Sequence, residues 1–234
     1  LVSVCYVDSE VGMVQPIHEI AEMLKDYPNC FLHVDCTQGV GKVKLNLQDV
    51  DLITFAPHKF YGLNGFGGLI KKKEIVLEPL INGGASTTIY RSGTPVVGQI
   101  CALEKALQIT FENFETREEY VRKLNEKLRT GLLKYPDIQI NTVGKENPFI
   151  LNLSITGIKA VEFKKKLEEN GVCVSIKSAC TVTITPSRIV MSMTHDRKRA
   201  LASWRISLSH LVTEEEINEF LDIFDKCYKE FKEV

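Results

Sequence analysis

The sequence lacks the features that mark several large classes of protein. No apolar run approaches the roughly 20 residues that a helix needs to cross a membrane. With 29 basic and 30 acidic residues the net charge is −1, so no basic excess marks a surface for nucleic acid or anionic lipid. The apolar start, residues 1–7, is too short for a signal peptide and has no charged beginning. We therefore expect neither a nucleic-acid nor a membrane partner.

A paired-cysteine motif is also missing. The sequence has seven cysteines but no Cys-x-x-Cys pair, which argues against a zinc site or a thioredoxin-like motif, so we expect no metal. An odd number of scattered thiols fits a reducing compartment and not a disulfide scaffold, and we expect a cytoplasmic protein. Most of these cysteines are expected to be buried small hydrophobes, Cys5 and Cys173 among them.

The first hundred residues alternate between short apolar runs and helical patterns. Strands are predicted at 1–7, 31–34, 52–55 and 67–70, and a helix follows Pro16, a residue favoured at the first helical position. Near-continuous apolar strands separated by helices or loops are typical of a sheet buried on both faces. The sequence therefore predicts an α/β fold.

A long helical pattern follows, over about 97–134, and ends at Tyr135-Pro136. It is either one long helix, kinked near Asn113, that links two domains, or two helices joined by a tight turn. We expect a partial large domain over residues 1–115 and a small α+β domain over 116–234.

The second half predicts a smaller α+β unit. One helix is expected over 160–170, and another after Thr213, which begins a Thr-x-x-Glu capping box. The predicted strands are 138–141, 149–155, 172–176 and 204–208.

A carboxylate and a lysine stand in a suggestive order in the first half. Asp35 ends an apolar strand, and Lys59 follows the next strand, 24 residues later, just before a glycine-rich stretch. Ligands of α/β proteins bind at the carboxyl ends of strands. A lysine can hold the aldehyde of pyridoxal phosphate as a Schiff base, while a carboxylate keeps the pyridine nitrogen protonated. Alternatively, Asp35 is only a turn cap and Lys59 a solvated surface group.

Five short segments together resemble the cysteine desulfurases of the class V aminotransferase family, which are fold type I pyridoxal phosphate enzymes. The resemblance covers nearly all of this chain but only a little over half of a family member, whose first portion we expect to be absent. It implies part of the mostly parallel large domain, followed by the small C-terminal domain. The segments are His33–Gln38, His58-Lys59, Arg91–Thr94, Ser178–Thr181 and Trp204–Ser207.

The resemblance implies a role for each residue at the cofactor. Lys59 would form the Schiff base, Asp35 would pair with the pyridine nitrogen, and Gln38 would bond to the phenolic oxygen of the ring. His58 would bind the phosphate. Thr94 would reach the phosphate in a neighbouring subunit, which implies a homodimer. His33 is interpreted as structural.

The remaining site residues concern the substrate and two departures from the family. Arg205, within an apolar strand, would grip the α-carboxylate of L-cysteine through a bidentate contact. Cys180 would take the sulfur as a persulfide. Ser9 stands where the family has an asparagine near the ring oxygen, and Ala56 stands where it has a phosphate-binding serine.

The leading hypothesis is a cysteine desulfurase that converts L-cysteine to L-alanine and passes sulfur to an acceptor protein for iron–sulfur cluster assembly. We expect this chain alone to be impaired. Three alternatives stay open at this point: a selenocysteine lyase, another class V aminotransferase, and a catalytically incomplete module for dimerisation or partner binding. Cys180 argues against an aminotransferase, whereas Ala56 favours the incomplete module.

Overall fold

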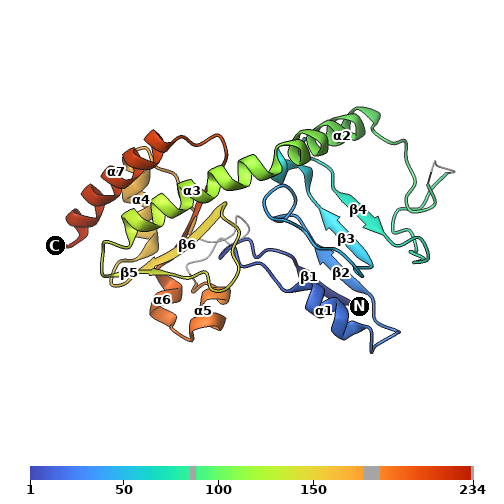
Figure 1. Ribbon diagram of the computed structural model, residues 1–234, viewed down its shortest axis with the longest axis horizontal. Helices are drawn as coiled ribbons and strands as arrows, with labels where there is room; N and C mark the ends of the chain where they lie inside the picture. The colour runs from blue at the N-terminus through green and yellow to red at the C-terminus, as the bar shows by residue number, and fades with distance from the viewer. Residues whose placement is uncertain (85–87, 177–184, 233–234) are drawn as a thin grey trace. The chain divides into compact units, whose positions relative to one another are not determined.

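The chain folds into two compact units joined by a helical connection (Figure 1). The computed structural model describes residues 1–84, 88–176 and 185–232. Unit 1 comprises residues 1–6 and 15–114, and unit 2 comprises residues 7–14 and 115–234. The second unit therefore takes in a short segment from near the start of the chain.

Unit 1 is built on a four-stranded sheet in the order β1-β2-β3-β4. The strands are β1 (Val2–Cys5), β2 (Leu32–Asp35), β3 (Leu52–Phe55) and β4 (Gly68–Lys71). β1, β2 and β3 run parallel, and β4 is antiparallel to β3. The sheet is thus mostly parallel, and the predicted α/β class is confirmed.

Two helices of unit 1 flank these strands in the sequence. α1 (Ile17–Leu24) begins directly after Pro16 and buries Ile17 and Ala21, one turn apart. The 3₁₀ helix η1 (Pro57–Phe60) follows β3 and buries Pro57 and Phe60.

The long helical pattern is interrupted at Asn113, the position at which the sequence predicts a kink or a turn. α2 (Val97–Glu112) and α3 (Phe114–Leu132) are separated by Asn113 alone, with φ −111° and ψ 8°. The amide of Asn113 donates from Nδ2 to the carbonyl of Ile109, which satisfies one of the last carbonyls of α2. The boundary between the units falls at this break.

Unit 2 packs helices against an antiparallel sheet in the order β5-β6-β7. The rings of Trp204, Phe163 and Phe224 meet at its centre, with centroids 5.3–6.2 Å apart. Its strands are β5 (Ile138–Ile140), β6 (Ile150–Ile155) and β7 (Ser203–Ser207), and its larger helices, besides α3, are α4 (Ala160–Glu169) and α7 (Glu214–Lys232).

The ends of these helices follow local sequence signals. The predicted capping box is confirmed: Thr213 Oγ1 accepts from the amide of Glu216, and Glu216 Oε2 accepts from the amide of Thr213. Two short helices were not predicted, α5 (Arg188–Thr194) and α6 (Arg197–Leu201). Side chains cap both, those of Ser187 and Asp196.

The strand predicted over 172–176 is wrong. In this segment only Ser175 pairs, through an isolated antiparallel bridge to Arg205 on β7. The amide of Ser175 donates to the carbonyl of Arg205 over 3.0 Å, and the reverse bond is 2.6 Å. One pair of bonds leaves the outer edge of β7 mostly without a neighbouring strand among the described residues.

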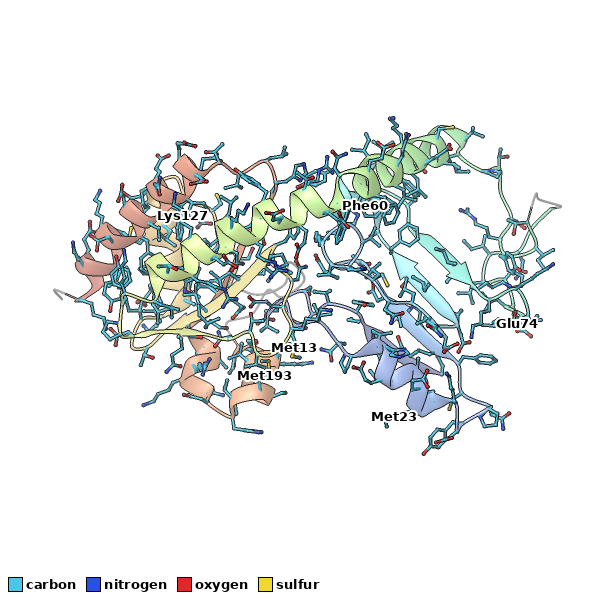
Figure 2. All side chains as sticks on the ribbon, in the orientation of Figure 1. Met13, Met23, Phe60, Glu74, Lys127 and Met193 are labelled. Atoms are coloured by element: carbon cyan, nitrogen blue, oxygen red, sulfur yellow. The ribbon has the colours of Figure 1, made fainter. Side chains whose placement is uncertain are left out.

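Residues 7–14 form a tight hairpin that belongs to unit 2. Val11 is fully buried in a small cluster with Val190 and Ala200. Met13 and Met193 pack against the same cluster, and Figure 2 labels both side chains. This cluster joins the early segment to α5 and α6.

The expectation that most cysteines are buried is wrong. Among the described cysteines, Cys36 and Cys227 are buried, whereas Cys5, Cys101 and Cys173 are exposed. Cys5 lies at the end of β1, an edge strand of which every second residue is exposed. Along the described residues, no helix is long and apolar enough to cross a membrane.

Candidate active site

The lysine of interest lies just beyond the carboxyl end of β3. Ala56 has an extended backbone (φ −119°, ψ 116°), as a residue before proline prefers, and Pro57 then starts the 3₁₀ turn. His58 and Lys59 occupy this turn, and both are exposed. The turn closes at Tyr61, which adopts a left-handed conformation with φ 68°. The amine of Lys59 is therefore accessible for covalent chemistry.

The carboxylate of Asp35 lies at the end of the neighbouring parallel strand. Asp35 pairs in register with Thr54 of β3, so β2 and β3 end on the same side of the sheet. Its Oδ1 accepts from the amide of Thr37 over 2.8 Å. Its Oδ2 accepts no hydrogen bond from the described residues. Asp35 therefore does make the turn contact of the cap interpretation, but with only one of its two oxygens.

His33 bridges all three parallel strands. Its Nδ1 lies 2.7 Å from the hydroxyl of Ser3 on β1, and its Nε2 lies 2.9 Å from the hydroxyl of Thr54 on β3. Both ring nitrogens are thus engaged, which agrees with the structural interpretation of His33.

Cys36 follows Asp35 but is unsuited to nucleophilic chemistry. Burial, and secondarily the charge of Asp35, raise the pKa of its thiol to about 12. The thiolate is the reactive form, so this cysteine is held inert at neutral pH.

Gln38 and Thr94 are the other predicted cofactor contacts in unit 1. Gln38 follows β2 and accepts from Lys42 Nζ through Oε1 over 2.8 Å. Thr94 lies in an exposed loop directly after Gly93, whose φ of 106° favours glycine. Among the described residues, no hydrogen bond or ion pair joins Thr94 to Lys59 or Asp35.

One glycine near the lysine turn has a packing role. A Cβ on Gly68 would lie 2.1 Å from the Phe55 ring, its cross-strand partner. Gly68 therefore makes room for an aromatic ring of β3.

Arg205 lies on β7 in unit 2, half-buried and only partly satisfied. Its Nη1 donates to the carbonyl of Ser9 over 2.6 Å, and its Nη2 lies 3.4 Å from the hydroxyl of Ser175. Its Nε is buried and has no hydrogen-bond partner among the described residues. Burial lowers the pKa of Arg205, and the nearby carboxylates of Glu10 and Asp8 oppose that shift.

Ser9 thus contacts Arg205 through its main-chain carbonyl and not through its side chain. It lies in the 7–14 hairpin, where Asp8 Oδ1 accepts from the amides of Glu10 and Val11 and fixes the turn. The other predicted substrate-side residue, Cys180, lies outside the described residues.

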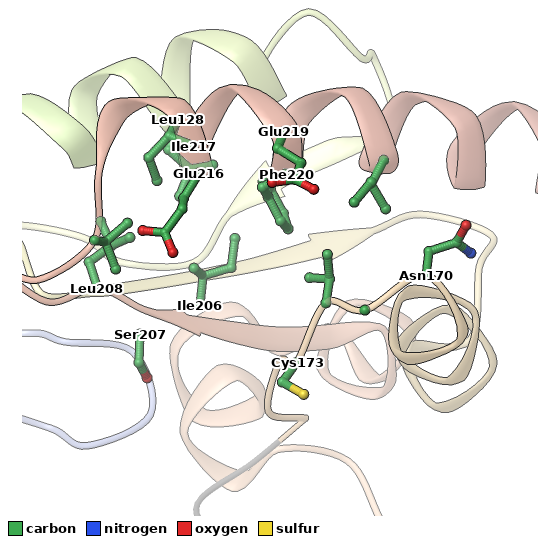
Figure 3. Close-up of a pocket in the computed structure, with 14 residues that line it drawn as sticks. Leu128, Asn170, Cys173, Ile206, Ser207, Leu208, Glu216, Ile217, Glu219 and Phe220 are labelled. Atoms are coloured by element: carbon green, nitrogen blue, oxygen red, sulfur yellow. The ribbon is translucent and has the colours of Figure 1, made fainter.

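A separate groove of about 380 Å³ lies in unit 2 (Figure 3). Its floor is apolar, with Ile206 and Leu208 beside Phe220, and the exposed thiol of Cys173 lies at its side. None of the predicted site residues that the structure describes lines it.

Most of the sequence matches a family model. Residues 1–220 match the family model described as aminotransferase class-V. The chain therefore belongs to the class V aminotransferase family.

Curated relatives carry desulfurase names. The chain is 32% identical over 241 residues to the cysteine desulfurase IscS of Clostridium botulinum, covering 100% of this chain and 60% of the relative. It is 35% identical over 232 residues to that of Salmonella typhi, covering 97% of this chain and 57% of the relative. The chain thus spans about three fifths of the length of these relatives.

Solved structures agree on the fold. A NifS-like protein superposes with a TM-score of 0.88 at 29% identity, covering 97% of this chain and 60% of the other. The NifS-like protein of Rickettsia africae gives 0.87, also at 29% identity, covering 97% and 61%. The predicted fold and family resemblance are confirmed.

Proposed function

We propose that this chain carries the lysine, carboxylate and arginine of a pyridoxal phosphate-dependent cysteine desulfurase. The proposal rests on one observation: the amine of Lys59 and the carboxylate of Asp35 lie at the carboxyl ends of adjacent parallel strands. Because the chain spans about 60% of its relatives, the activity is proposed for the whole protein.

The residues of unit 1 fit pyridoxal phosphate. Asp35 Oδ2, which accepts no hydrogen bond from the residues that the structure describes, suits a protonated pyridine nitrogen. Lys59 offers an exposed primary amine for an aldehyde. His58 is an exposed donor for the phosphate, with Thr94 from a second subunit and Gln38 at the ring oxygen. When bound, the cofactor supplies an electron sink for cleavage at the β-carbon of the substrate.

The protein side chains then bind the substrate and move protons. Lys59 would hold the cofactor covalently, and its amine would accept and return a proton at the α-carbon of the substrate. Asp35 holds the pyridine proton in place by a charge-assisted hydrogen bond. Arg205 binds the α-carboxylate of L-cysteine.

The sulfur of the substrate is then transferred to a cysteine of the protein. The thiolate of Cys180 attacks the sulfur of the bound substrate, an S–S bond forms as the C–S bond breaks, and protonation of the remaining carbon yields L-alanine. The persulfide passes to an acceptor protein for iron–sulfur cluster assembly, in a cytoplasmic homodimer.

Reductive trapping of the lysine tests the proposal. The chain is loaded with pyridoxal phosphate, reduced with borohydride and mapped by peptide mass spectrometry. We expect the label on Lys59, and Lys59→Arg should abolish it, whereas Lys71→Arg serves as a matched control. A label on Lys42 or Lys71 would refute the assignment, and no label would favour a module without cofactor.

Cofactor affinity provides a second measurement. The side chain of Ala56 cannot donate to a phosphate, so we expect weak binding by the chain and a gain in affinity for Ala56→Ser. An absorbance titration measures both, and tight stoichiometric binding by the unmodified chain would contradict this expectation.

A further inference from the structure

Polar side chains cross the interior of unit 2 where β6 is otherwise apolar. Asn141, Asn152 and Ser154 are each at most 1% exposed. Burying an amide costs free energy unless its groups are hydrogen-bonded, so the bonds of this row decide what it does. Its members bond to one another and to two segments distant in the sequence.

The hydrogen bonds of this row all run in one donor-to-acceptor direction, and Arg199 sets that direction. The Nε–H of Arg199 donates to Asn141 Oδ1 over 2.7 Å, and arginine has no acceptor atom. Asn141 must therefore donate through its Nδ2, and it does so to Asn152 Oδ1 over 2.7 Å. The Nδ2 of Asn152 is left as a donor and bonds to the carbonyl of Glu10 over 3.0 Å.

This row ends on the hairpin that also holds Arg205. The carbonyl of Ser9, directly before that of Glu10, accepts from Arg205 Nη1. Asn152 and Arg205 are also cross-strand partners on β6 and β7. The two side chains therefore fix two consecutive carbonyls of a single turn, whose peptide planes meet at the Cα of Glu10 and are coupled through its φ and ψ.

The contacts of Arg205 with the described residues leave one edge of its guanidinium for a ligand. Nη1 is committed to Ser9, whereas the buried Nε has no partner in the described part of the chain and the Nη2 contact is long, 3.4 Å. Nε and Nη2 form the pair of donors that a carboxylate engages bidentately. An ordered Ser9 carbonyl thus determines which edge faces the ligand.

We propose that Asn152 is a positioning residue for Arg205, with its own amide oriented by Arg199 through Asn141. It acts by holding the Glu10 carbonyl, and with it the Ser9 carbonyl that fixes the guanidinium. The proposal rests on the proposed function only in taking an amino-acid carboxylate as the ligand of Arg205.

An isosteric substitution isolates this role. Asn152→Asp replaces the donor to Glu10 with an oxygen that repels the carbonyl. Asn125→Asp is the matched control, since Asn125 is also buried, accepts from Arg129 Nε and donates to the Pro148 carbonyl. Each variant loses one amide donor to a buried carbonyl, but only Asn152 bonds to the hairpin.

The primary readout is the Nε–H signal of Arg205 in ¹⁵N NMR spectra of the chain, assigned by its absence in Arg205→Lys. We expect its solvent exchange to accelerate at least about tenfold in Asn152→Asp, as loss of one buried hydrogen bond implies, and to stay within about twofold in Asn125→Asp. In a titration with L-alanine, the Kd should rise about tenfold in Asn152→Asp alone.

Several outcomes would overturn the proposal: unchanged exchange in Asn152→Asp, equal acceleration in both variants, or a fast-exchanging Arg205 signal in the unmodified chain. If Asn152→Asp fails to fold, Arg199→Met should accelerate the solvent exchange of the Arg205 Nε–H, and Arg199→Lys should keep it slow. Equal exchange in these two variants would refute the orientation of the row by Arg199. Accelerated exchange without any L-alanine binding supports the positioning role and refutes Arg205 as the carboxylate site.

Discussion

The two units differ in how completely they bury their own apolar side chains. In unit 2, α7 buries Ile217, Phe224 and Tyr228, and Trp204 is 1% exposed. In unit 1, α2 has only Thr110 buried, whereas Ile100 and Phe111 on the same helix are 52% and 63% exposed. Because helices in proteins are stabilised chiefly by packing, α7 is held by its own core and α2 gains much less from its unit.

The candidate site residues differ in the same way. Lys59 and Thr94 of unit 1 are exposed and are placed by backbone turns. Arg205 of unit 2 is half-buried and placed by side-chain and carbonyl hydrogen bonds. Accessibility suits a covalent anchor, whereas fixed direction suits the recognition of a planar carboxylate.

Truncating the core of unit 2 should have the largest effect. Phe224→Ala should lower the free energy of unfolding by about 3–5 kcal/mol, because it leaves a cavity among packed rings. Phe111→Ala in α2 should change it by less than about 0.5 kcal/mol. Urea unfolding followed by far-UV circular dichroism measures both units, and the fluorescence of Trp204, the single tryptophan, reports unit 2 alone. Similar losses in both variants would remove the contrast between the units.

Alkaline pH should weaken unit 2. Burial and the carboxylates of Asp225 and Asp137 raise the pKa values of Tyr135 and Tyr228, respectively, to about 12. Since the folded state holds these protons more tightly than the unfolded state, the stabilisation is complete below pH 10 and is lost as the pH rises towards 12. Urea midpoints of unit 2 should fall over that range, and Tyr228→Phe should keep roughly half of the dependence. A flat profile would contradict the shifts.

Thiol labelling should separate buried from exposed cysteines. With a pKa of about 12, Cys36 is on the order of 10⁻⁴ thiolate at pH 8, and it is also inaccessible. Among the described cysteines, iodoacetamide at that pH should label Cys5, Cys101 and Cys173 before Cys36, as peptide mapping would show. Equally fast labelling of Cys36 would mean that the end of β2 opens readily.

The smallest effect is expected at a surface ion pair. Lys123 and Glu119 lie one turn apart on α3, with Nζ 2.8 Å from Oε1, and both side chains are about two-thirds exposed. Screened pairs of this kind contribute little, so Lys123→Ala should leave the urea midpoint unchanged within error. A clear loss would show that surface charges stabilise α3.

Much of the fold could be predicted because it is encoded locally. The strand predicted over 52–55 coincides with β3, and the capping box at Thr213 is present. Both depend on neighbouring residues: an apolar run between turns, and a hydroxyl three residues before a glutamate.

The parts that could not be predicted depend on contacts distant in the sequence. Residues 172–176 have the composition of a strand, but only Ser175 pairs with β7. Asn152 gave one local signal, an amide within the apolar run of β6, but its partners Asn141 and Glu10 could not be deduced from spacing. Lys59 and Asp35 were found by their order after consecutive strands, and their roles stay predictions.

The placement of the 7–14 hairpin in unit 2 has a consequence for synthesis. The chain passes between units three times, after Tyr6, after Val14 and after Phe114. The hairpin is made early, but its bonds to Thr142, Asn152 and Arg205 span 131, 142 and 196 residues. At the usual 5–20 residues per second, the ribosome needs roughly 10–40 s more before Arg205 is made. Unit 2 therefore completes its hydrogen bonding only after Arg205 has been made, long after the hairpin itself.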